Sequence, residues 1–520
     1  MKKLSLMLAV MLTVVFTAGS ALACSSIYVG SALTDGSTYF GRSEDYANSR
    51  NKMMYVSPAG NHKAGEEYNG CYGFTYTFTH DSYSYTAFSD DNREGAGNVC
   101  PNCGQTHAHT PYEAGGTNEM GVTISATETL YGSEAAAAAD PYEDAGIEEA
   151  EITTVILSEA ATAKEGIELL TKIYAETGCN GASGIFIADN TEVWYIENLS
   201  GHSYVAVKLA EDAVLAEPNM SIIGAIDLDD TENVIASEGL IELAKKGGFF
   251  VGDEEANVIN YSASFNPEGA PNSRMKNALQ YFNAAYDFSE TDPAFELYAV
   301  TNVDAEGNII APKTGIVLDR TFTAADVINY YHIAGIGSVR NLETHVFQLS
   351  KEDGKTDTIE WVAMDDATCN VFVPYYPMLT TDTDASLKLS TATAVFTEEE
   401  PTEGIYYATT KRTRVDGEVV TLEGFCSLPA NWADSMYWSI DAISNLVAYG
   451  NLTEEQIAAV HEAMDAQQQK VYDAFTTTKA NVAAAATEEE AAKIATADSM
   501  AMVDELHQLA VKLVGDVTAK

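Results

Sequence analysis

Hydrophobic and polar positions change their period several times along the chain. Residues 27–33 and 38–41 are rich in strand-forming side chains, and Asp35-Gly36 between them favours a tight hairpin turn. Residues 51–94 are rich in Tyr, Phe and Thr, with an alternation that is typical of strands. The N-terminal part is therefore expected to be built mainly from β-structure, beginning with a hairpin.

A helical period appears in two other places. Apolar side chains recur three and four positions apart over residues 153–177, which predicts one amphipathic helix that Gly178 closes. The same spacing returns from Leu452 onward in two stripes, separated by the Ala-rich stretch 483–487, and predicts two further helices. The acidic stretch 140–151 is expected to be exposed.

Length and charge narrow the class of protein. A chain of 520 residues with 46% hydrophobic and 20% charged residues can bury a substantial core. Its formal charge is 28 minus 77, or −49, which argues against nucleic acid and anionic membrane surfaces as partners. Beyond residue 23 we find no apolar run long enough to span a bilayer. We expect a highly soluble protein in an exposed setting.

The first 24 residues have the parts of a secretory signal followed by a cysteine. Two lysines precede an apolar run at residues 4–17, and Ala21 and Ala23 supply the small residues that a signal peptidase requires. Cleavage after Ala23 would make Cys24 the first residue of the mature protein. The mature protein is then expected outside the cytoplasmic membrane, either soluble or loosely bound to the cell surface.

An N-terminal cysteine combines a nucleophile with a base on one residue. Its α-amine titrates near pKa ~7.7–8.0 and its thiol near pKa ~8.5, so each can exchange a proton at neutral pH. Hydrolases with an N-terminal Thr, Ser or Cys use this pairing. Two alternatives stay open: Cys24 could form a disulfide, or it could be acylated in a lipoprotein. Lipoprotein signals usually have Leu at the third position before the cysteine, where this chain has Ala21.

The predicted hairpin returns two charged side chains toward Cys24. The second strand ends in Arg42-Ser43-Glu44-Asp45. A cation near a thiol lowers its pKa and supports the thiolate, and a carboxylate can hold the α-amine in position. Arg42 and Asp45 are therefore candidate site residues, although a surface Arg–Asp pair is a common alternative.

A second group of cysteines lies in a predicted loop at residues 95–116. Cys100 and Cys103 stand in a Cys-Pro-x-Cys-Gly motif, and His107 and His109 follow. Such a turn can point two thiolates at one zinc ion, so these four residues are candidate ligands of a structural zinc. A local disulfide or an idle pair is the alternative. The six cysteines other than Cys24 allow up to three disulfides.

The hairpin motifs resemble a known family. Cys-Ser-Ser-Ile-Tyr-Val-Gly at residues 24–30 and Gly-Arg-Ser-Glu-Asp at residues 41–45 are similar to the cysteine-type N-terminal-nucleophile hydrolases. This group includes penicillin V acylase, bile-salt hydrolase and a bacterial dipeptidase branch, which the motifs resemble most. The resemblance implies an α+β fold, the four-layer α/β/β/α sandwich. It covers residues 24–448, which we take as the catalytic domain after a signal peptide at 1–23, with a helical extension at 449–520.

The same resemblance implies three further site residues. Asn118 matches the asparagine of an Asn-Glu-x-Gly-Val segment and would donate its amide N–H to the oxyanion. Asn219 matches a family asparagine close to the nucleophile, and Arg274 matches the second arginine of the site. The alternatives are that Asn118 only forms a turn and that Arg274 only caps a local helix.

The sequence thus predicts a secreted dipeptidase that hydrolyses amide bonds of dipeptides or small peptides. The α-amine of Cys24 would take the thiol proton, Arg42 and Arg274 would tune charge, and Asp45 would orient the amine. No cofactor is required for this chemistry. An acylase of bile-salt or penicillin type and a non-catalytic surface lipoprotein are the alternatives. The sequence is compatible with an oligomer of identical chains.

Overall fold

The computed structural model describes most of the chain after the predicted signal peptide. The described residues are 24–46, 51–70, 73–90, 112–127, 130–351, 354–389, 394–415 and 418–519. The predicted signal peptide and the four candidate zinc ligands, Cys100, Cys103, His107 and His109, lie outside them.

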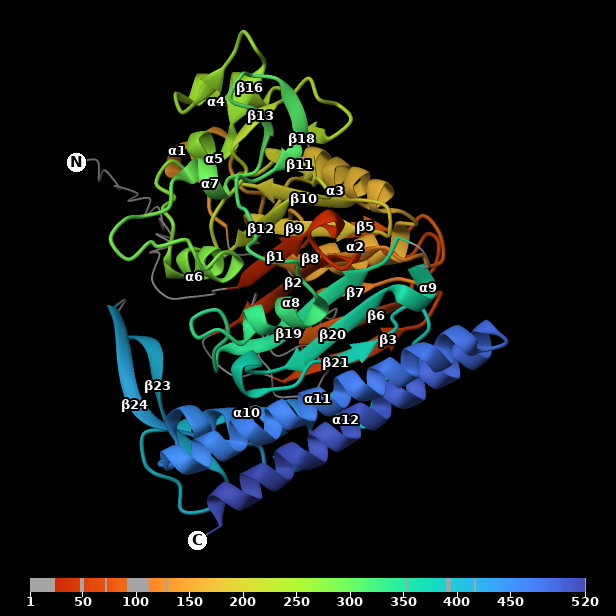
Figure 1. Ribbon diagram of the computed structural model, residues 1–520. Coiled ribbons are helices and arrows are strands. Elements are labelled where there is room, and N and C mark those ends of the chain that lie inside the picture. Colours follow the sequence, from red (N-terminus) through yellow and green to blue (C-terminus); the bar gives the residue numbers. More distant parts are fainter. Residues whose placement is uncertain are drawn as a thin grey trace, which may run out of the picture.

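Two antiparallel sheets form the centre of the molecule (Figure 1). The six-stranded sheet has the order β12 (Val214–Glu217), β1 (Ser25–Val29), β2 (Thr38–Asp45), β19 (Asn341–Leu349), β20 (Ile359–Met364), β21 (Val373–Tyr375). The eight-stranded sheet has the order β14 (Val234–Ala236), β11 (Tyr204–Lys208), β10 (Val193–Asn198), β9 (Ser183–Ala188), β8 (Thr123–Thr127), β7 (Glu113–Thr117), β6 (Tyr85–Asp90), β3 (Lys52–Ser57).

Smaller sheets and a set of helices surround these two sheets. The smaller sheets are β13 (Ala225–Asp227) with β16 (Val258–Asn260) and β15 (Gly252–Asp253); β17 (Thr301–Val303) with β18 (Ile309–Lys313); β22 (Val395–Thr397) with β24 (Glu418–Ser427) and β23 (Tyr406–Val415); and β4 (Glu67–Asn69) with β5 (Thr75–Thr77). The helices are α1 (Glu134–Ala139), α2 (Glu149–Glu159), α3 (Ala163–Thr177), α4 (Leu240–Gly247), α5 (Tyr261–Phe265), α6 (Ser273–Phe282), α7 (Phe295–Tyr298), α8 (Ala324–Tyr331), α9 (Gly354–Asp357), α10 (Met436–Tyr449), α11 (Glu454–Ala484) and α12 (Glu488–Thr518).

The predicted N-terminal hairpin is present. Strands β1 and β2 pair antiparallel, with Ser26 opposite Arg42. Gly36 adopts φ +105° in the connection, a backbone conformation that glycine tolerates best. The first strand is shorter than expected, because Ser31–Leu33 forms a 3-10 turn instead of continuing it.

The helix expected over residues 153–177 is two helices, α2 and α3. The Thr162 hydroxyl accepts a hydrogen bond from the Glu165 amide and so starts α3. The apolar stripe continues across this break, so periodicity alone could not reveal it. The expected exposure of the acidic stretch 140–151 is wrong at its end, because α2 begins at Glu149 and the side chains of Glu148, Glu149 and Glu151 are buried.

Helices cover the two sheets on different sides. Helices α2 and α3 contact β7, β8, β9 and β10 of the eight-stranded sheet, whereas α8, α10, α11 and α12 contact strands of the six-stranded sheet. The sheets meet through contacts between β2 and β8, and beside them the ring of Phe40 on β2 stacks on that of Phe186 on β9, with the centroids 5.6 Å apart. The described chain is therefore a mixed α/β fold in which the interface between two sheets is a major part of the core.

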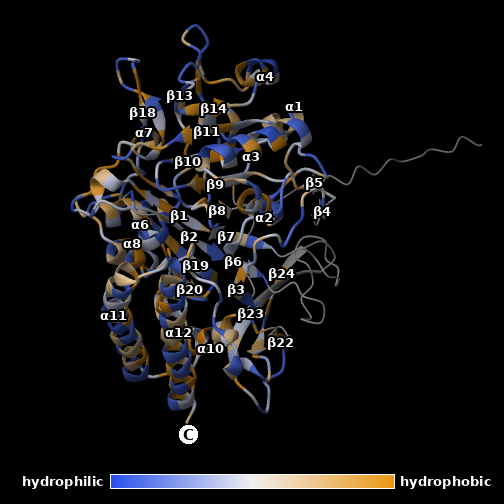
Figure 2. Ribbon diagram, turned by 90° about the vertical axis from the view of Figure 1, so that its right-hand side faces the viewer, coloured by the Kyte–Doolittle hydropathy of each residue, from blue (hydrophilic) through white to orange (hydrophobic). Residues whose placement is uncertain are grey.

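The two helices expected after Leu452 are α11 and α12, which lie side by side below the sheets (Figure 2). Gln468 joins α11 to the chain just before β21, because its side chain accepts from the Phe372 amide at 2.7 Å and donates to the Phe372 carbonyl at 3.2 Å. The extension thus packs on the rest of the molecule. None of the described helices is long and apolar enough to cross a membrane.

Part of the loop expected at residues 95–116 is strand β7 in the described chain. Gly115 and Gly116 have low strand propensity, but β7 is held between β6 and β8 in the interior of the sheet. At Gly116 an added Cβ would lie 1.9 Å from the Thr86 carbonyl oxygen, so the backbones approach too closely for a larger residue. Tertiary pairing overrides local propensity here.

Candidate active site

Cys24 stands immediately before β1 and is buried, with 3% of its surface exposed. Paired residues of antiparallel strands point to the same face, and so do residues two apart along one strand. Ser26 pairs with both Arg42 and Glu217, so Cys24, Arg42 and Glu217 share one face of the six-stranded sheet. This face looks toward the eight-stranded sheet, where the Thr127 side chain hydrogen-bonds the Cys24 thiol.

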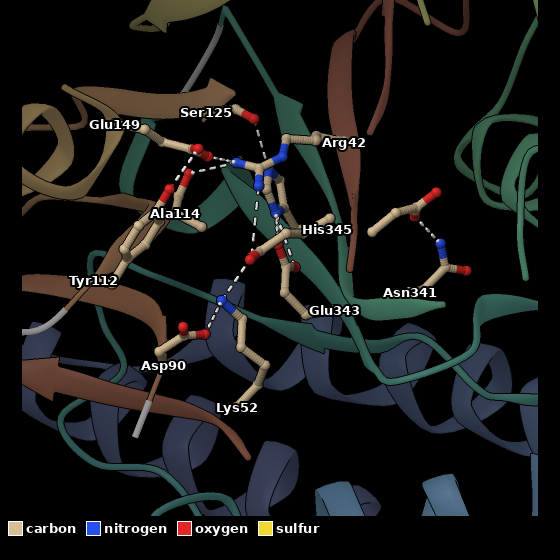
Figure 3. A network of polar contacts seen from close by, with 12 residues as sticks. Arg42, Lys52, Asp90, Tyr112, Ala114, Ser125, Glu149, Asn341, Glu343 and His345 are labelled. Carbon is tan, nitrogen blue, oxygen red and sulfur yellow. Dashed lines mark hydrogen bonds and ion pairs between the residues drawn. The ribbon is translucent and has the colours of Figure 1, made fainter. Parts of the chain in front are cut away.

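Arg42 is buried in a cluster of charged groups (Figure 3), with 1% of its surface exposed. Its Nη1 lies 2.9 Å from Oε1 of Glu149 and 3.4 Å from the Ala114 carbonyl oxygen, to which it donates. Its Nη2 lies 3.5 Å from Oε2 of Glu44. The cation beside the nucleophile is therefore held by carboxylates from its own strand and from helix α2.

The network extends from Arg42 to two further anchors. Lys52 Nζ contacts Glu44 Oε2 at 2.6 Å and Asp90 Oδ1 at 2.9 Å. The Tyr112 hydroxyl donates to Glu149 Oε2 at 2.7 Å. Both carboxylates that contact Arg42 are thus fixed by a second partner.

His345 lies beside this network and is fully buried. Its Nδ1 is 3.0 Å from Oε2 of Glu343, and its Nε2 is 2.8 Å from the Ser125 hydroxyl on β8. Burial alone would raise the pKa of the Glu343 carboxyl, but His345 holds that pKa below its usual value. His345 pairs with Arg42 across β19 and β2, so it belongs to the same face of the sheet.

Burial dominates the acidity of the nucleophile in the uncleaved chain. It raises the pKa of the Cys24 thiol to about 11, while Arg42 acts in the opposite direction and Glu149 and Asp45 add to the rise. The expected effect of Arg42 thus has the predicted sign. It does not by itself produce a thiolate while Cys24 remains in a peptide bond with Ala23.

Asp45 and Arg274 lie on the opposite face of the hairpin. Arg274 Nη2 forms an ion pair with the buried Asp45, and its Nη1 donates to the Ser25 hydroxyl at 2.8 Å. The Asn341 amide also donates to Asp45. Burial raises the pKa of Asp45 to about 6, although Arg274 opposes that rise. Helix α6 is capped by Asn272, so the alternative of Arg274 as a local cap is wrong.

Asn219 follows β12 and lies near Cys24 by register. β1 and β12 pair Ser26 with Glu217, and the same register continued by two residues places Asn219 opposite Cys24. Asn219 adopts φ +63°, and its Oδ1 is buried without a hydrogen-bond partner among the described residues. The Asn272 amide holds the preceding Pro218 carbonyl at 2.6 Å. A buried amide oxygen without a partner is unusual and points to a functional role.

Asn118 lies elsewhere, and its predicted role as oxyanion donor is wrong. Its Nδ2 donates to the carbonyls of Leu157 and Ala160 at 2.9 and 2.8 Å, at the C-terminal end of α2. Its Oδ1 accepts from the Met120 and Val122 amides, both at 3.0 Å. All the hydrogen-bonding groups of its side chain are engaged, and its two partners lie eight and eleven residues after Glu149, roughly 12–16 Å along the axis of α2. The turn interpretation holds.

The sequence did not reveal Glu149, Glu44, Lys52 or His345 as parts of the site. One local pattern could have indicated that a helix begins at Glu149. It is Glu148-x-x-Glu151, which forms the capping box at the start of α2. Among the described residues, no group of three or more His, Cys, Asp or Glu side chains is arranged to hold a metal ion.

Comparison with known proteins places the chain in a family. The model of peptidase family C69 matches residues 23–297, more than half of the chain. The chain belongs to peptidase family C69. This confirms the resemblance carried by the motifs at residues 24–30 and 41–45.

The chain is similar to several curated members and to two solved structures. "Probable dipeptidase B" of Streptococcus pyogenes serotype M1 is 31% identical over 395 residues, covering 72% of this chain and 76% of the relative. "Probable dipeptidase" of Salmonella dublin is 29% identical over 374 residues, 69% of this chain and 82% of the relative. Penicillin V acylase from Agrobacterium tumefaciens matches with 13% identity and TM-score 0.31 over 66% of this chain and 82% of that one. A conjugated bile acid hydrolase variant from Clostridium perfringens matches with 13% identity and TM-score 0.29 over 66% and 89%.

Proposed function

We propose that this protein is a dipeptidase whose nucleophile is the thiol of Cys24, after cleavage behind Ala23. Membership in peptidase family C69 and the dipeptidase names of its relatives support peptide hydrolysis. The observation that carries the proposal is the placement of Cys24 at the start of β1. Arg42 lies on one face of the hairpin, and the Asp45–Arg274 pair lies on the other.

The chemistry follows from the two groups of an N-terminal cysteine. The free α-amine takes the thiol proton, directly or through water, and the thiolate attacks the scissile carbonyl carbon. The resulting ammonium then protonates the leaving amine as the C–N bond breaks. Water hydrolyses the thioester that remains and regenerates the thiol. Asp45 orients the ammonium, and Arg42 supplies positive charge beside the sulfur.

The oxyanion donor in this mechanism is Asn219 and no longer Asn118. Asn219 lies opposite Cys24 in the continued register, and its Oδ1 has no partner among the described residues. An amide in this position can turn its N–H toward the carbonyl oxygen of a bound peptide as negative charge develops there. A backbone N–H would be the second donor.

The finer statements about fold and location belong to the same proposal. We infer that the two sheets with helices on both sides form the four-layer α/β/β/α sandwich of the N-terminal-nucleophile hydrolases. The chain then acts outside the cytoplasmic membrane as a cysteine-type peptidase after removal of residues 1–23, with dipeptides as substrates and without a required cofactor.

One experiment tests the nucleophile and the location together. The mature protein, isolated from culture medium or cell surface, is analysed by intact mass and then assayed with a panel of dipeptides. We expect a free N-terminal Cys24 and release of both amino acids. A diacylglyceryl adduct on Cys24, or a mature end at another residue, would contradict the mechanism. Cleavage of acyl-amide substrates in place of dipeptides would identify an acylase.

A further inference from the structure

Glu149 contacts Arg42 from a different layer of the molecule. It is the first residue of α2, and its Oε1 lies 2.9 Å from Arg42 Nη1. The exposed fractions of Glu149 and Arg42 are 4% and 1%. An ion pair this deeply buried is costly to form and costly to break, so its geometry is held strongly.

Two observations make Glu149 the principal partner of Arg42. The other nearby carboxylate, Glu44, lies 3.5 Å from Arg42 but 2.6 Å from Lys52, so it is mainly engaged with the lysine. Glu149 lies closer to Arg42, at 2.9 Å, and its second oxygen is fixed by the Tyr112 hydroxyl at 2.7 Å. The carboxylate that orients the guanidinium is therefore itself oriented.

The same pair acts on the nucleophile. Burial raises the pKa of the Cys24 thiol, Arg42 lowers it, and Glu149 raises it again. Glu149 and a Cys24 thiolate thus compete for one cation. A carboxylate that holds the guanidinium in place also limits how much of its charge the sulfur receives.

We propose that Glu149 is a positioning residue that fixes the Arg42 guanidinium beside Cys24 and sets how strongly this cation acts on the nucleophile. The inference rests on the proposed function, because it assigns to Cys24 the attacking thiol. Glu149 does not touch the reacting atoms in this role. It acts through Arg42.

Several other charged or titratable groups face Arg42 and Cys24, and the effect of Glu149 must be separated from theirs. They are Glu44 and Asp45 on β2, Lys52 on β3, Tyr112 before β7, Glu217 on β12, Glu343 and His345 on β19, and Arg274 on α6. None of these changes in the variants below, so differences between the variants report on position 149.

The test compares three variants of the mature protein. Glu149→Gln keeps the length of the side chain but removes its charge, and Glu149→Asp keeps the charge but shortens the reach. Glu159→Gln is the matched control, because Glu159 is the last residue of α2 and its carboxylate accepts from the Thr79 amide at 2.9 Å, about 15 Å along the axis from Glu149. Each is measured by iodoacetamide alkylation of Cys24 against pH, by kcat and KM, and by melting temperature.

We expect Glu149→Gln to lower the pH midpoint of Cys24 alkylation by about one unit, because a nearby negative charge is lost. Its kcat should fall roughly 10-fold or more, because Arg42 loses its anchor, with a smaller change in KM. Glu149→Asp should keep the midpoint of the wild type but lose turnover. Glu159→Gln should leave the alkylation midpoint and kcat unchanged.

A lower melting temperature of Glu149→Gln with an unchanged alkylation midpoint and normal kcat would overturn the inference and leave a structural role only. If Glu149→Gln does not fold, a normal kcat in Glu149→Asp would overturn it equally. Failure of the proposed function gives a different result. If the wild type hydrolyses no dipeptide but the alkylation midpoint still shifts in Glu149→Gln, the dipeptidase assignment is wrong and the role of Glu149 stands.

Discussion

The two faces of the β1–β2 hairpin carry different kinds of arginine–carboxylate pair beside the same cysteine. On the inner face, Arg42 is 1% exposed and pairs with Glu149 from another layer. On the outer face, Arg274 is 14% exposed and pairs with Asp45 from the hairpin itself. The inner arginine lies in a network of buried charges, whereas the outer one lies near the surface at the start of a helix.

The difference arises because one short motif at the end of β2 places charged side chains on both faces of the sheet. In Arg42-Ser43-Glu44-Asp45, successive residues point to opposite faces of the sheet. Arg42 and Glu44 therefore enter the interface between the sheets, and Asp45 faces α6. Cys24, immediately before the start of the neighbouring strand β1, has charged groups on both sides.

The largest loss of activity is expected from replacing Cys24, which has charged groups on both faces of the hairpin beside it. Cys24→Ala should abolish dipeptide hydrolysis, since the attacking atom is gone, while the fold survives because alanine fits the buried position. Cys24→Ser should keep weak activity at most, because a hydroxyl is far harder to deprotonate than a thiol. Kinetics and circular dichroism on variants with a verified N-terminus measure this. Wild-type turnover in Cys24→Ala would remove the cysteine from the mechanism.

Replacing Arg42 or Arg274 should show that the two faces of the hairpin differ in their contribution to stability. Arg42→Met leaves Glu149 buried without its cation and should cost about 3–5 kcal/mol of unfolding free energy together with activity. Arg274→Met should reduce activity but cost only about 1–2 kcal/mol, because Asp45 retains the Asn341 hydrogen bond and can take up a proton. Urea unfolding and dipeptide assays on both variants provide the comparison. Equal losses of stability would mean that the two faces do not differ as described.

Asn118 lies on neither face of the hairpin, so its replacement should affect stability more than turnover. Asn118→Ala removes the hydrogen bonds to the Leu157 and Ala160 carbonyls, and two buried acceptors without donors should cost about 2–4 kcal/mol. Turnover of the folded fraction should stay within about twofold of the wild type, since the residue is far from Cys24. A stable Asn118→Ala protein with greatly reduced kcat would restore it to the site.

The smallest effect concerns the pH dependence of stability on the outer face. Asp45 has a pKa of about 6 in the uncleaved folded chain, above its ordinary value of 3.8. The folded state then binds this proton more tightly than the unfolded state, so this contribution to stability is lost as pH rises from about 4 to about 6. Asp45→Asn should flatten that part of the curve. Urea unfolding between pH 4 and 7 on both uncleaved proteins tests it, and parallel curves would contradict the assignment.

Parts of the site were predictable because they are local or carried by a family motif. The Asp35-Gly36 turn and the short strands around it define which residues return to Cys24, so Arg42 and Asp45 could be named. Asn219 and Arg274 came from the family resemblance, and the structure places both near the nucleophile. Asn118 came from the same source and was wrong, because a motif that specifies a turn carries no distance to another strand.

The sequence by itself determined the hairpin, the candidate nucleophile at its start and the family of the protein. Tertiary structure alone decided which buried groups of the other sheet and of helix α2 lie against them. Glu149 lies in an acidic stretch that was expected to be exposed, and nothing in its sequence neighbours shows that α2 brings it to Arg42. The physical reason is that hydrogen-bonded turns and strand alternation depend on residues a few positions apart. The charge that a buried cysteine experiences depends on layers that are more than a hundred residues away along the chain.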